Sequence, residues 1–295
     1  RTAPEEPAAV SDPAGLIELD GPFIDKLAIA LQAQIVGRSF QGGAPGAPTL
    51  CGPFSTTRRK YDGRIFWDAD VWMLPSLLVL NPNAAKRISE FRIHQQGPAA
   101  AIAWSYAQAG FPRLETDGRR RSRFVPPVIQ PVEVDSKLVR YPWESDRLGR
   151  EAGKTESIFQ EHINGSVCLG LQMASDWGLI SRSSLESLKK RAGAWYLARS
   201  STAKGRGRGF LGVMSPDESS IVDNDLYTNS LAQWLTGQKF VRPRDSFSFL
   251  SFDNDKVRGY KQHAALLTLF PLQDQEAESQ AEAMLNRFSG KASTE

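Results

Sequence analysis

Cysteine and histidine are scarce in this chain of 295 residues, which contains two cysteines and three histidines. Cys51 and Cys168 lie far apart without CxxC spacing, which argues against a disulfide framework and against a zinc knuckle. The histidines, His94, His162 and His263, also lack the paired spacing of metal ligands. We therefore expect neither a metal site nor a cofactor.

Long apolar runs and an excess of one charge are absent as well. No segment approaches the roughly 20 apolar residues that cross a bilayer, so we expect no membrane insertion. The 36 lysines and arginines are nearly balanced by 33 aspartates and glutamates, for a formal net charge of +3. This balance argues against a dedicated nucleic-acid surface. The concentrated basic run, Arg119 to Arg121 with Arg123, is interpreted as a solvated loop.

Apolar residues recur at helical spacing along the chain, whereas the strict alternation typical of half-buried strands is almost absent. The spacing predicts a first helix over residues 23–31 and a helical region over residues 84–109. The dipeptide Gly97-Pro98 is expected to interrupt that region. A further helix is predicted over residues 163–171. The pattern indicates an all-α protein.

Three more helix signals lie in the second half of the chain. Ser183 and Glu186 have the spacing of a capping box and precede the best-defined apolar series of the sequence. Asp223 or Asn224 is expected to cap the next helix. A last amphipathic helix is predicted over residues 281–288.

Long irregular segments separate these helices, over residues 41–63, 112–145 and 202–223. Loops of this length are uncommon inside a compact domain unless they carry function. We therefore expect the active site in these loops.

Two tryptophan–carboxylate pairs stand at the ends of loops. Trp67-Asp68 is followed closely by Asp70, and Trp143-Glu144 repeats the same chemistry. Proteins hold sugars in this way, with an aromatic ring against the C–H face and carboxylates accepting hydrogen bonds from hydroxyl groups. The alternative is a tryptophan-rich helix start that uses aspartate as a cap.

Other polar groups have two interpretations each. Glu161 and His162 are either an acid/base pair or caps at a helix start, where acidic residues are common. Glu218 follows Pro216 and Asp217, and a carboxyl crowded by other acids can have the raised pKa that a general acid needs. Its alternative is an ordinary solvated acidic turn. Lys261-Gln262 either bind a sugar or face water.

Six motifs occur in a fixed order between Tyr61 and Pro271: WD, YPWES, EHIN, PDE, DNxxYTN and KQ. The series resembles glycoside hydrolase family 65, which contains acid trehalases and maltose, trehalose and kojibiose phosphorylases. The resemblance implies an incomplete (α/α)6 toroid over residues 22–290, between a linker-like segment 1–21 and a frayed tail 291–295. We expect a partial catalytic domain without the β-sandwich and without the last part of the barrel.

The resemblance also implies roles for individual residues. Glu218 is the expected general acid of an inverting reaction on an α-linked glucose disaccharide or conjugate, with trehalose as the leading substrate. The expected sugar-binding residues are Trp67, Asp68, Trp143, Glu144, His162, Lys261 and Gln262. The carboxylate base of a hydrolase, or the phosphate loop of a phosphorylase, is expected beyond the matched segment. Two alternatives stay open, a glucosyl phosphorylase and a truncated sugar-binding protein without catalysis.

Overall fold

The computed structural model describes residues 64–111, 137–153, 155–203, 207–218, 221–246, 248–255 and 263–288. Several predictions concern residues outside these ranges. They are the helix over residues 23–31, the basic run from Arg119, the terminal segments 1–21 and 291–295, and the pair Lys261-Gln262.

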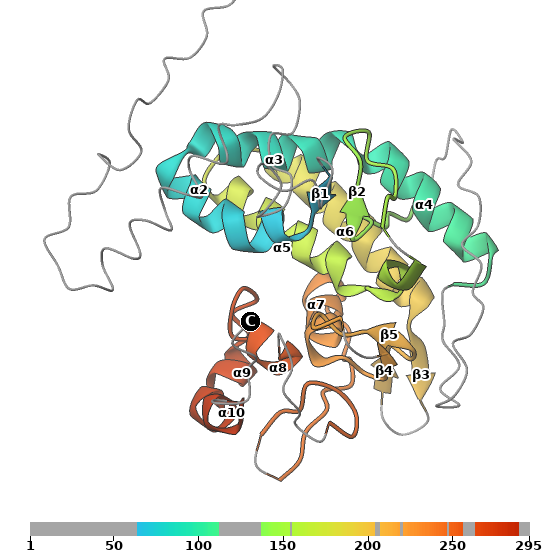
Figure 1. Ribbon diagram of the computed structural model, residues 1–295, viewed down its shortest axis with the longest axis vertical. Coiled ribbons are helices and arrows are strands. Elements are labelled where there is room, and N and C mark those ends of the chain that lie inside the picture. The colour runs from blue at the N-terminus through green and yellow to red at the C-terminus, as the bar shows by residue number, and fades with distance from the viewer. Residues whose placement is uncertain are drawn as a thin grey trace, which may run out of the picture.

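The described part of the chain is mostly helical. Figure 1 shows five helices gathered in one layer, with the remaining helices and most of the strands below it. The helices of the first layer are α2 (Leu74–Leu80), α3 (Pro82–His94), α4 (Gln96–Gln108), α5 (His162–Asp176) and α6 (Arg182–Arg199). Those below are α7 (Leu226–Thr236), α8 (Ala264–Leu267), α9 (Gln275–Glu278) and α10 (Ala281–Phe288).

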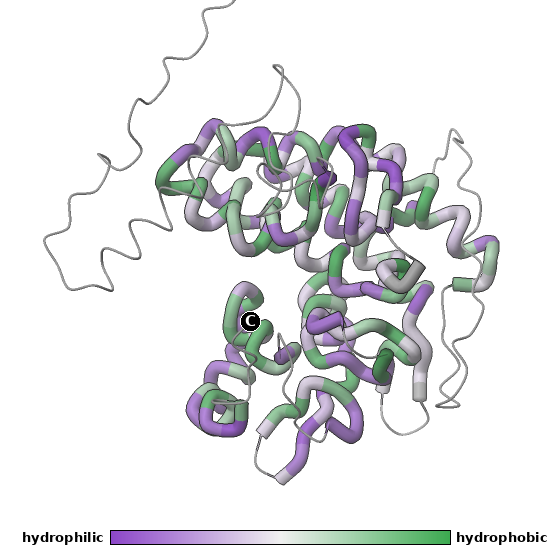
Figure 2. The backbone as a smooth tube through the Cα atoms, in the orientation of Figure 1, coloured by the Kyte–Doolittle hydropathy of each residue, from purple (hydrophilic) through white to green (hydrophobic). Residues whose placement is uncertain are grey.

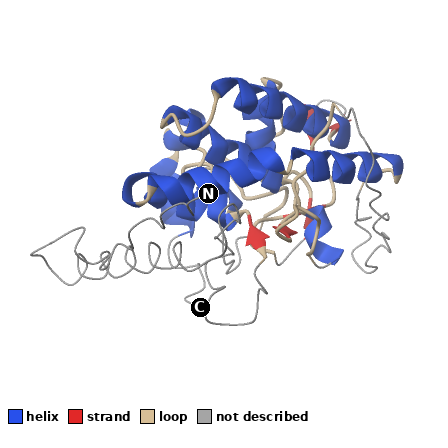
Figure 3. Cartoon of the chain, turned by 90° about the horizontal axis from the view of Figure 1, so that it is seen from above, coloured by secondary structure: helices blue, strands red, loops and turns tan. Residues whose placement is uncertain are grey.

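Short strands and two irregular helical turns complete the described structure, and in Figure 3 the strands are few beside the helices. The strands form three antiparallel pairs, β1 (Ile65–Phe66) with β2 (Glu144–Ser145), β3 (Ser201–Ala203) with β4 (Gly207–Gly209), and β5 (Val213–Met214) with β6 (Ile221–Val222). The turns are the π-helix η3 (Ala69–Met73) and the 3-10 helix η4 (Thr155–Phe159). The prediction of an all-α chain is therefore corrected to a mostly helical one, and the toroid stays a prediction.

Helix α5 lies at the centre of the main hydrophobic core, between α6, α7 and η3. Its predicted apolar stripe is confirmed, because Ile163, Val167 and Leu171 are almost completely buried. The helix also approaches α7 closely at Gly165, where an added Cβ atom would lie 2.6 Å from Cβ of Leu231. In Figure 2 hydrophobic and hydrophilic residues alternate along the helices, as expected for helices that bury one side.

The predicted helix boundaries need two corrections at the N-terminal caps. Helix α6 is capped by Ser181, whose hydroxyl accepts a hydrogen bond from the Ser184 amide at 3.2 Å, so the capping box at Ser183 is wrong. Helix α7 is capped by Asp225, not by Asp223 or Asn224. A cap is the last residue with non-helical backbone, and spacing in the sequence does not reveal where that residue falls.

The interruption expected at Gly97-Pro98 is also displaced. Helix α3 ends at His94 and α4 begins at Gln96, so Gly97 and Pro98 lie in the first turn of α4. Proline is tolerated there because the amides of the first turn have no partner within the helix.

The predicted last helix is confirmed as α10. Met284 and Phe288 pack in a small core with Phe249, while Leu285 of the same helix is 52% exposed. None of the described helices is long and apolar enough to cross a membrane.

Candidate active site

The Trp67-Asp68 pair lies between β1 and η3, and Arg92 of α3 binds the residues on both sides of it. Asp70 and Arg92 form a buried ion pair, with Arg92 Nε 3.0 Å from Asp70 Oδ1. Arg92 also donates a hydrogen bond to the carbonyl of Phe66 at 3.1 Å. The residues on both sides of Trp67-Asp68, Phe66 and Asp70, therefore bind the same guanidinium group. The carboxylate of Asp70 is buried in this ion pair, whereas the side chain of Asp68 is partly accessible.

The Trp143-Glu144 pair is brought beside the first pair by strand pairing. Phe66 of β1 is opposite Glu144 of β2 in the antiparallel register. The Trp143 ring packs edge-on against Phe66, with ring centroids 5.0 Å apart. Arg64 donates to Glu144 Oε1 at 2.7 Å, and Glu144 is almost completely buried. Two motifs distant in sequence thus form one wall of the candidate site.

Asn164 of the EHIN motif fixes the segment that leads into Trp143. Its Oδ1 accepts from the Tyr141 amide and its Nδ2 donates to the Val139 carbonyl, both at 2.8 Å. This side-chain amide satisfies the backbone of an irregular segment that no strand covers. Asn164 is not among the residues that we expected to contribute to the site.

Glu161 occupies the N-cap position of α5, as one interpretation of the sequence expected, but its side chain makes no capping hydrogen bond. Its carboxylate instead accepts from Trp195 Nε1 at 2.7 Å and from Arg199 Nε at 3.2 Å, and all three side chains are buried. The local sequence did not indicate this buried ion pair, because both partners lie more than 30 positions away.

His162 lies underneath the site. Its ring is completely buried and packs edge-on against Trp67, with ring centroids 4.7 Å apart. Burial lowers the pKa of His162 to about 3, so the imidazole is neutral at physiological pH. The described structure leaves no surface of His162 for a sugar, and Trp67 is itself only 2% exposed.

Glu218 stands at the end of a tight turn between β5 and β6. Its amide donates to the Ser215 carbonyl at 2.9 Å, and its φ of 62° lies in the left-handed region. Gln160 contacts it through a long hydrogen bond, with Nε2 3.5 Å from Oε1. Asp217 is buried, whereas Glu218 is exposed. The turn is thus not simply a solvated acidic loop, because its other acid points into the protein.

Contacts of one short segment connect the Glu218 turn to the WD motif. Gln160 contacts Glu218, and His162, two positions later at the start of α5, packs against Trp67. Burial raises the pKa of Asp68 from 3.8 to about 6, a backbone hydrogen bond opposes the shift, and the charges of Glu218 and Asp70 add to it. The WD and PDE motifs thus both contact the segment that begins α5.

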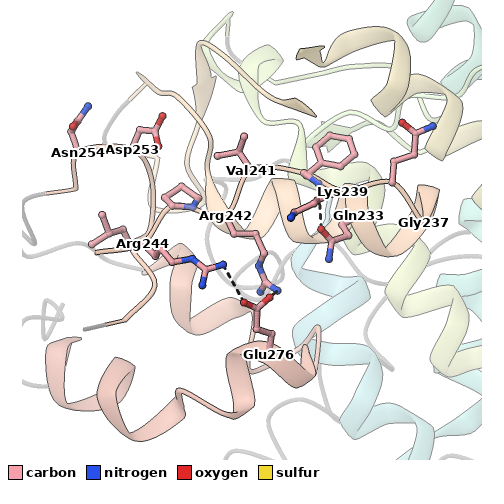
Figure 4. A pocket seen from close by; sticks show the side chains of 13 residues that line it. Gln233, Gly237, Lys239, Val241, Arg242, Arg244, Asp253, Asn254 and Glu276 are labelled. Atoms are coloured by element: carbon pink, nitrogen blue, oxygen red, sulfur yellow. Dashed lines mark hydrogen bonds and ion pairs between the residues drawn. The ribbon is translucent and has the colours of Figure 1, made fainter. Parts of the chain in front are cut away.

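A cleft of about 770 Å³ lies elsewhere and is drawn in Figure 4. Arg242 lines it and binds Glu276 at 2.7 Å and Asp274 at 2.9 Å. Arg244 also binds Glu276, at 3.3 Å. The cleft shares no residue with the candidate site and begins at the C-terminal end of α7. The ion pairs of Arg242 and Arg244 connect α9 to the segment after α7.

A family model matches the part of the chain that contains five of the six motifs, all but Lys261-Gln262. Residues 52–241 match the family model described as the glycosyl hydrolase family 65 central catalytic domain. The chain belongs to glycosyl hydrolase family 65.

The names of several curated relatives describe enzymes that act on glucosides. A protein-glucosylgalactosylhydroxylysine glucosidase of Mus musculus is 30% identical over 187 residues, which are 59% of this chain and 22% of the relative. A kojibiose hydrolase of Mucilaginibacter mallensis is 27% identical over 61% of this chain and 24% of its own length. An acid trehalase of Emericella nidulans is 30% identical over 48% of this chain and 12% of its own length.

A solved structure also matches part of the chain. A putative kojibiose phosphorylase from the human microbiome has a TM-score of 0.45 and 23% identity, over 60% of this chain and 23% of that chain. The chain spans about a quarter or less of the length of these relatives.

Membership in family 65 does not by itself identify the residues that hold the site together. Arg64, Arg92, Asn164 and Asp225 each bind a residue of the site or the backbone beside it. Sequence analysis missed them as contributors because each binds a residue at least ten positions away in the chain. Only the EHIN motif pointed to one of them, Asn164, because Asp225 occupies an unspecified position of the DNxxYTN motif.

Proposed function

We propose that this chain is the acid-bearing part of an inverting glycoside hydrolase that acts on an α-linked glucose disaccharide or glucosyl conjugate. The observation that carries the proposal is that two distant motifs contact the same segment: Gln160 contacts Glu218, and His162 packs against Trp67. A glycosidase needs at least one protonated carboxyl group beside a sugar-binding wall. The Trp143-Glu144 pair supplies that wall.

Glu218 is the general acid in this proposal. It gives its proton to the glycosidic oxygen while the C–O bond to the anomeric carbon breaks, and a water molecule adds to that carbon from the opposite face and loses a proton to a base. The exposed position of Glu218 at the tip of its turn suits contact with a substrate. The base that accepts this proton is expected beyond the matched segment, as the family resemblance implies.

The proposed glucose subsite combines described residues with two carried over from the motif. Asp68 and Trp143 are the partly accessible members, and buried Glu144 lies beside them. Trp67 and His162 support the subsite from below. Lys261 and Gln262 complete it by motif match. Carboxylates and amides of this kind read the direction of sugar hydroxyl groups through hydrogen bonds.

Three α-glucosides are the first substrates to test: trehalose, kojibiose and maltose. Glucose release would be measured with and without inorganic phosphate, and the anomer first formed would be identified by proton NMR. We expect release that does not depend on phosphate and a β-anomeric product, as inversion requires.

Two variants separate catalysis from folding. Glu218→Gln is expected to lower turnover by about 10²–10⁴-fold, the contribution of a general acid. Glu186→Gln is the matched control, because Glu186 is an exposed carboxylate on α6 with a partner at 3.5 Å. Phosphate-dependent formation of glucose 1-phosphate would identify a phosphorylase instead. Sugar binding by a folded chain without any turnover would identify a non-catalytic binding protein.

A further inference from the structure

The buried carboxylate of Asp225 joins helix α7 to the turn that presents Glu218. Its Oδ1 accepts from the amide and the hydroxyl of Thr228, at 2.8 and 2.7 Å, which caps α7. Its Oδ2 accepts from the Ser215 hydroxyl at 3.0 Å. Asp225 and Thr228 are completely buried and Ser215 is 1% exposed. The two oxygens of one side chain thus have different partners.

Ser215 is the first residue of the Glu218 turn. Its carbonyl accepts from the Glu218 amide at 2.9 Å, and its hydroxyl is bound to Asp225. Glu218 has a φ of 62°, a conformation that residues with a side chain adopt at a cost. A residue in such a conformation persists when surrounding contacts hold it. The buried hydrogen bond between Ser215 and Asp225 is such a contact, because Ser215 also binds the Glu218 amide.

The two residues before Asp225 hold neighbouring segments. Asp223 accepts from the Gly212 amide at 2.8 Å, which fixes the approach to β5. Asn224 has a φ of 53° and donates through its backbone amide to the Phe210 carbonyl at 2.7 Å. The run from Asp223 to Asp225 therefore follows the loop that leads to Glu218, and the described contacts of Asp225 reach the turn itself.

Capping alone does not require a carboxylate at this position. Asparagine and serine cap helices about as well as aspartate does, and neither carries a charge that must be desolvated. Burial raises the pKa of Asp225 to about 6, hydrogen bonds from Thr228 and Ser215 oppose the shift, and the charge of Asp217 adds to it. Position 225 thus carries a fully buried carboxylate, although a neutral cap would avoid the free-energy cost of desolvating a charge.

We propose that Asp225 is a positioning residue for the general acid, which acts through Ser215 to hold the turn of Glu218 in its left-handed conformation. The inference rests on the proposed function of Glu218. The alternative is that Asp225 only stabilises α7.

A pair of variants distinguishes these roles. Ser215→Ala and Thr228→Val each remove one hydroxyl donor to the same carboxylate, but only Ser215→Ala detaches the Glu218 turn. Thr228→Val keeps the size of the side chain and the backbone amide that caps α7. Thermal unfolding of both variants would show that their effects on stability are matched.

The first readout is the dependence on the leaving group. A disaccharide needs a proton from the acid, whereas α-glucosyl fluoride releases an anion that leaves with little protonation. We expect Ser215→Ala to lower kcat on the disaccharide about 10–100-fold, less than the loss of the general acid itself, and to change fluoride release less than about threefold. Thr228→Val should change neither rate by more than about threefold. Equal losses on both substrates, or equal losses in both variants, would overturn the proposal.

The second readout does not depend on activity. Hydrogen exchange at the Glu218 amide reports opening of its bond to Ser215. We expect exchange at least about tenfold faster in Ser215→Ala than in Thr228→Val, and exchange at the same rate in both would refute the positioning role. If the unaltered chain turns over no substrate, the proposed function fails while this readout still decides the inference. Should Ser215→Ala unfold, Ser215→Cys replaces it, because a thiol is a weak donor.

Discussion

The strongest effect on stability is expected from the buried ion pair between Glu161 and Arg199. Both side chains are 1% exposed, and Trp195 donates a further hydrogen bond to the carboxylate. Arg199 also donates to the Leu211 carbonyl at 3.0 Å, in the loop that leads to Glu218. Arg199→Met keeps most of the volume of the side chain but leaves Glu161 without its nearest positive charge.

The magnitude follows from desolvation. Removing one partner of a buried ion pair costs about 3–5 kcal/mol, because the remaining charge is left in a poorly polar environment. Arg140 lies close enough for its pKa to be raised by the charge of Glu161, so part of the compensation persists in Arg199→Met. We therefore expect the free energy of unfolding to fall by about 3 kcal/mol, the lower end of that range.

Urea unfolding of two further variants tests the cause. Glu161→Gln in the Arg199→Met background removes the uncompensated charge while an amide oxygen still accepts from Trp195, so the double variant should be more stable than Arg199→Met alone. Arg150→Met breaks an exposed pair, in which Arg150 is 72% exposed, and should cost less than about 1 kcal/mol. If Glu161→Gln restores no stability, the unpaired charge is not the reason for the loss.

Two further predictions concern a buried acid and a close helix contact. The pKa of Asp225 is raised from 3.8 to about 6, so the folded state binds a proton more tightly and stability should fall by up to roughly 3 kcal/mol as pH rises through this window; urea unfolding of Asp225→Asn should show a smaller slope, since the pKa of Asp68 is raised over the same window. An added methyl group in Gly170→Ala would lie 2.7 Å from the Asp70 carbonyl oxygen. This variant should lose about 1–3 kcal/mol and displace Asp68, whereas Gly97→Ala, with nothing within 4 Å, should lose none in the same denaturation assay.

Sequence patterns predicted the helices that bury a continuous stripe. The stripes of α5 and α10 were recognised because their apolar residues repeat with the helical period, which is a local property. The caps at Ser181 and Asp225 were not, since both lie next to other residues that cap equally well. Only the backbone angles decide among such neighbours, and tertiary contacts set those angles.

For the candidate site, too, the sequence revealed local features but not tertiary contacts. The motifs indicated Trp67, Asp68, Trp143, Glu144 and Glu218 as chemical groups. The structure places the first four on β2 or beside β1 and β2, and Glu218 in the turn between β5 and β6. Only the family resemblance selected Asp68 over Asp70; the local residues did not show that one is partly accessible and the other is held in an ion pair. That difference depends on an arginine in another helix.

The buried polar groups of this protein explain why the site and the core depend on each other. Asp70 is held by Arg92, Glu144 by Arg64, and the turn of Glu218 by Ser215 and Asp225. Each contact places a charge in surroundings of low polarity, where a hydrogen bond is strong when it is made and costly when it is lost. Apolar residues in the same places would hold the helices together with less penalty. Hydrogen bonds to charged groups fix the direction of their partners as well as the distance. The proposed roles of Asp68 and Glu218 at one glycosidic bond require this kind of fixed orientation.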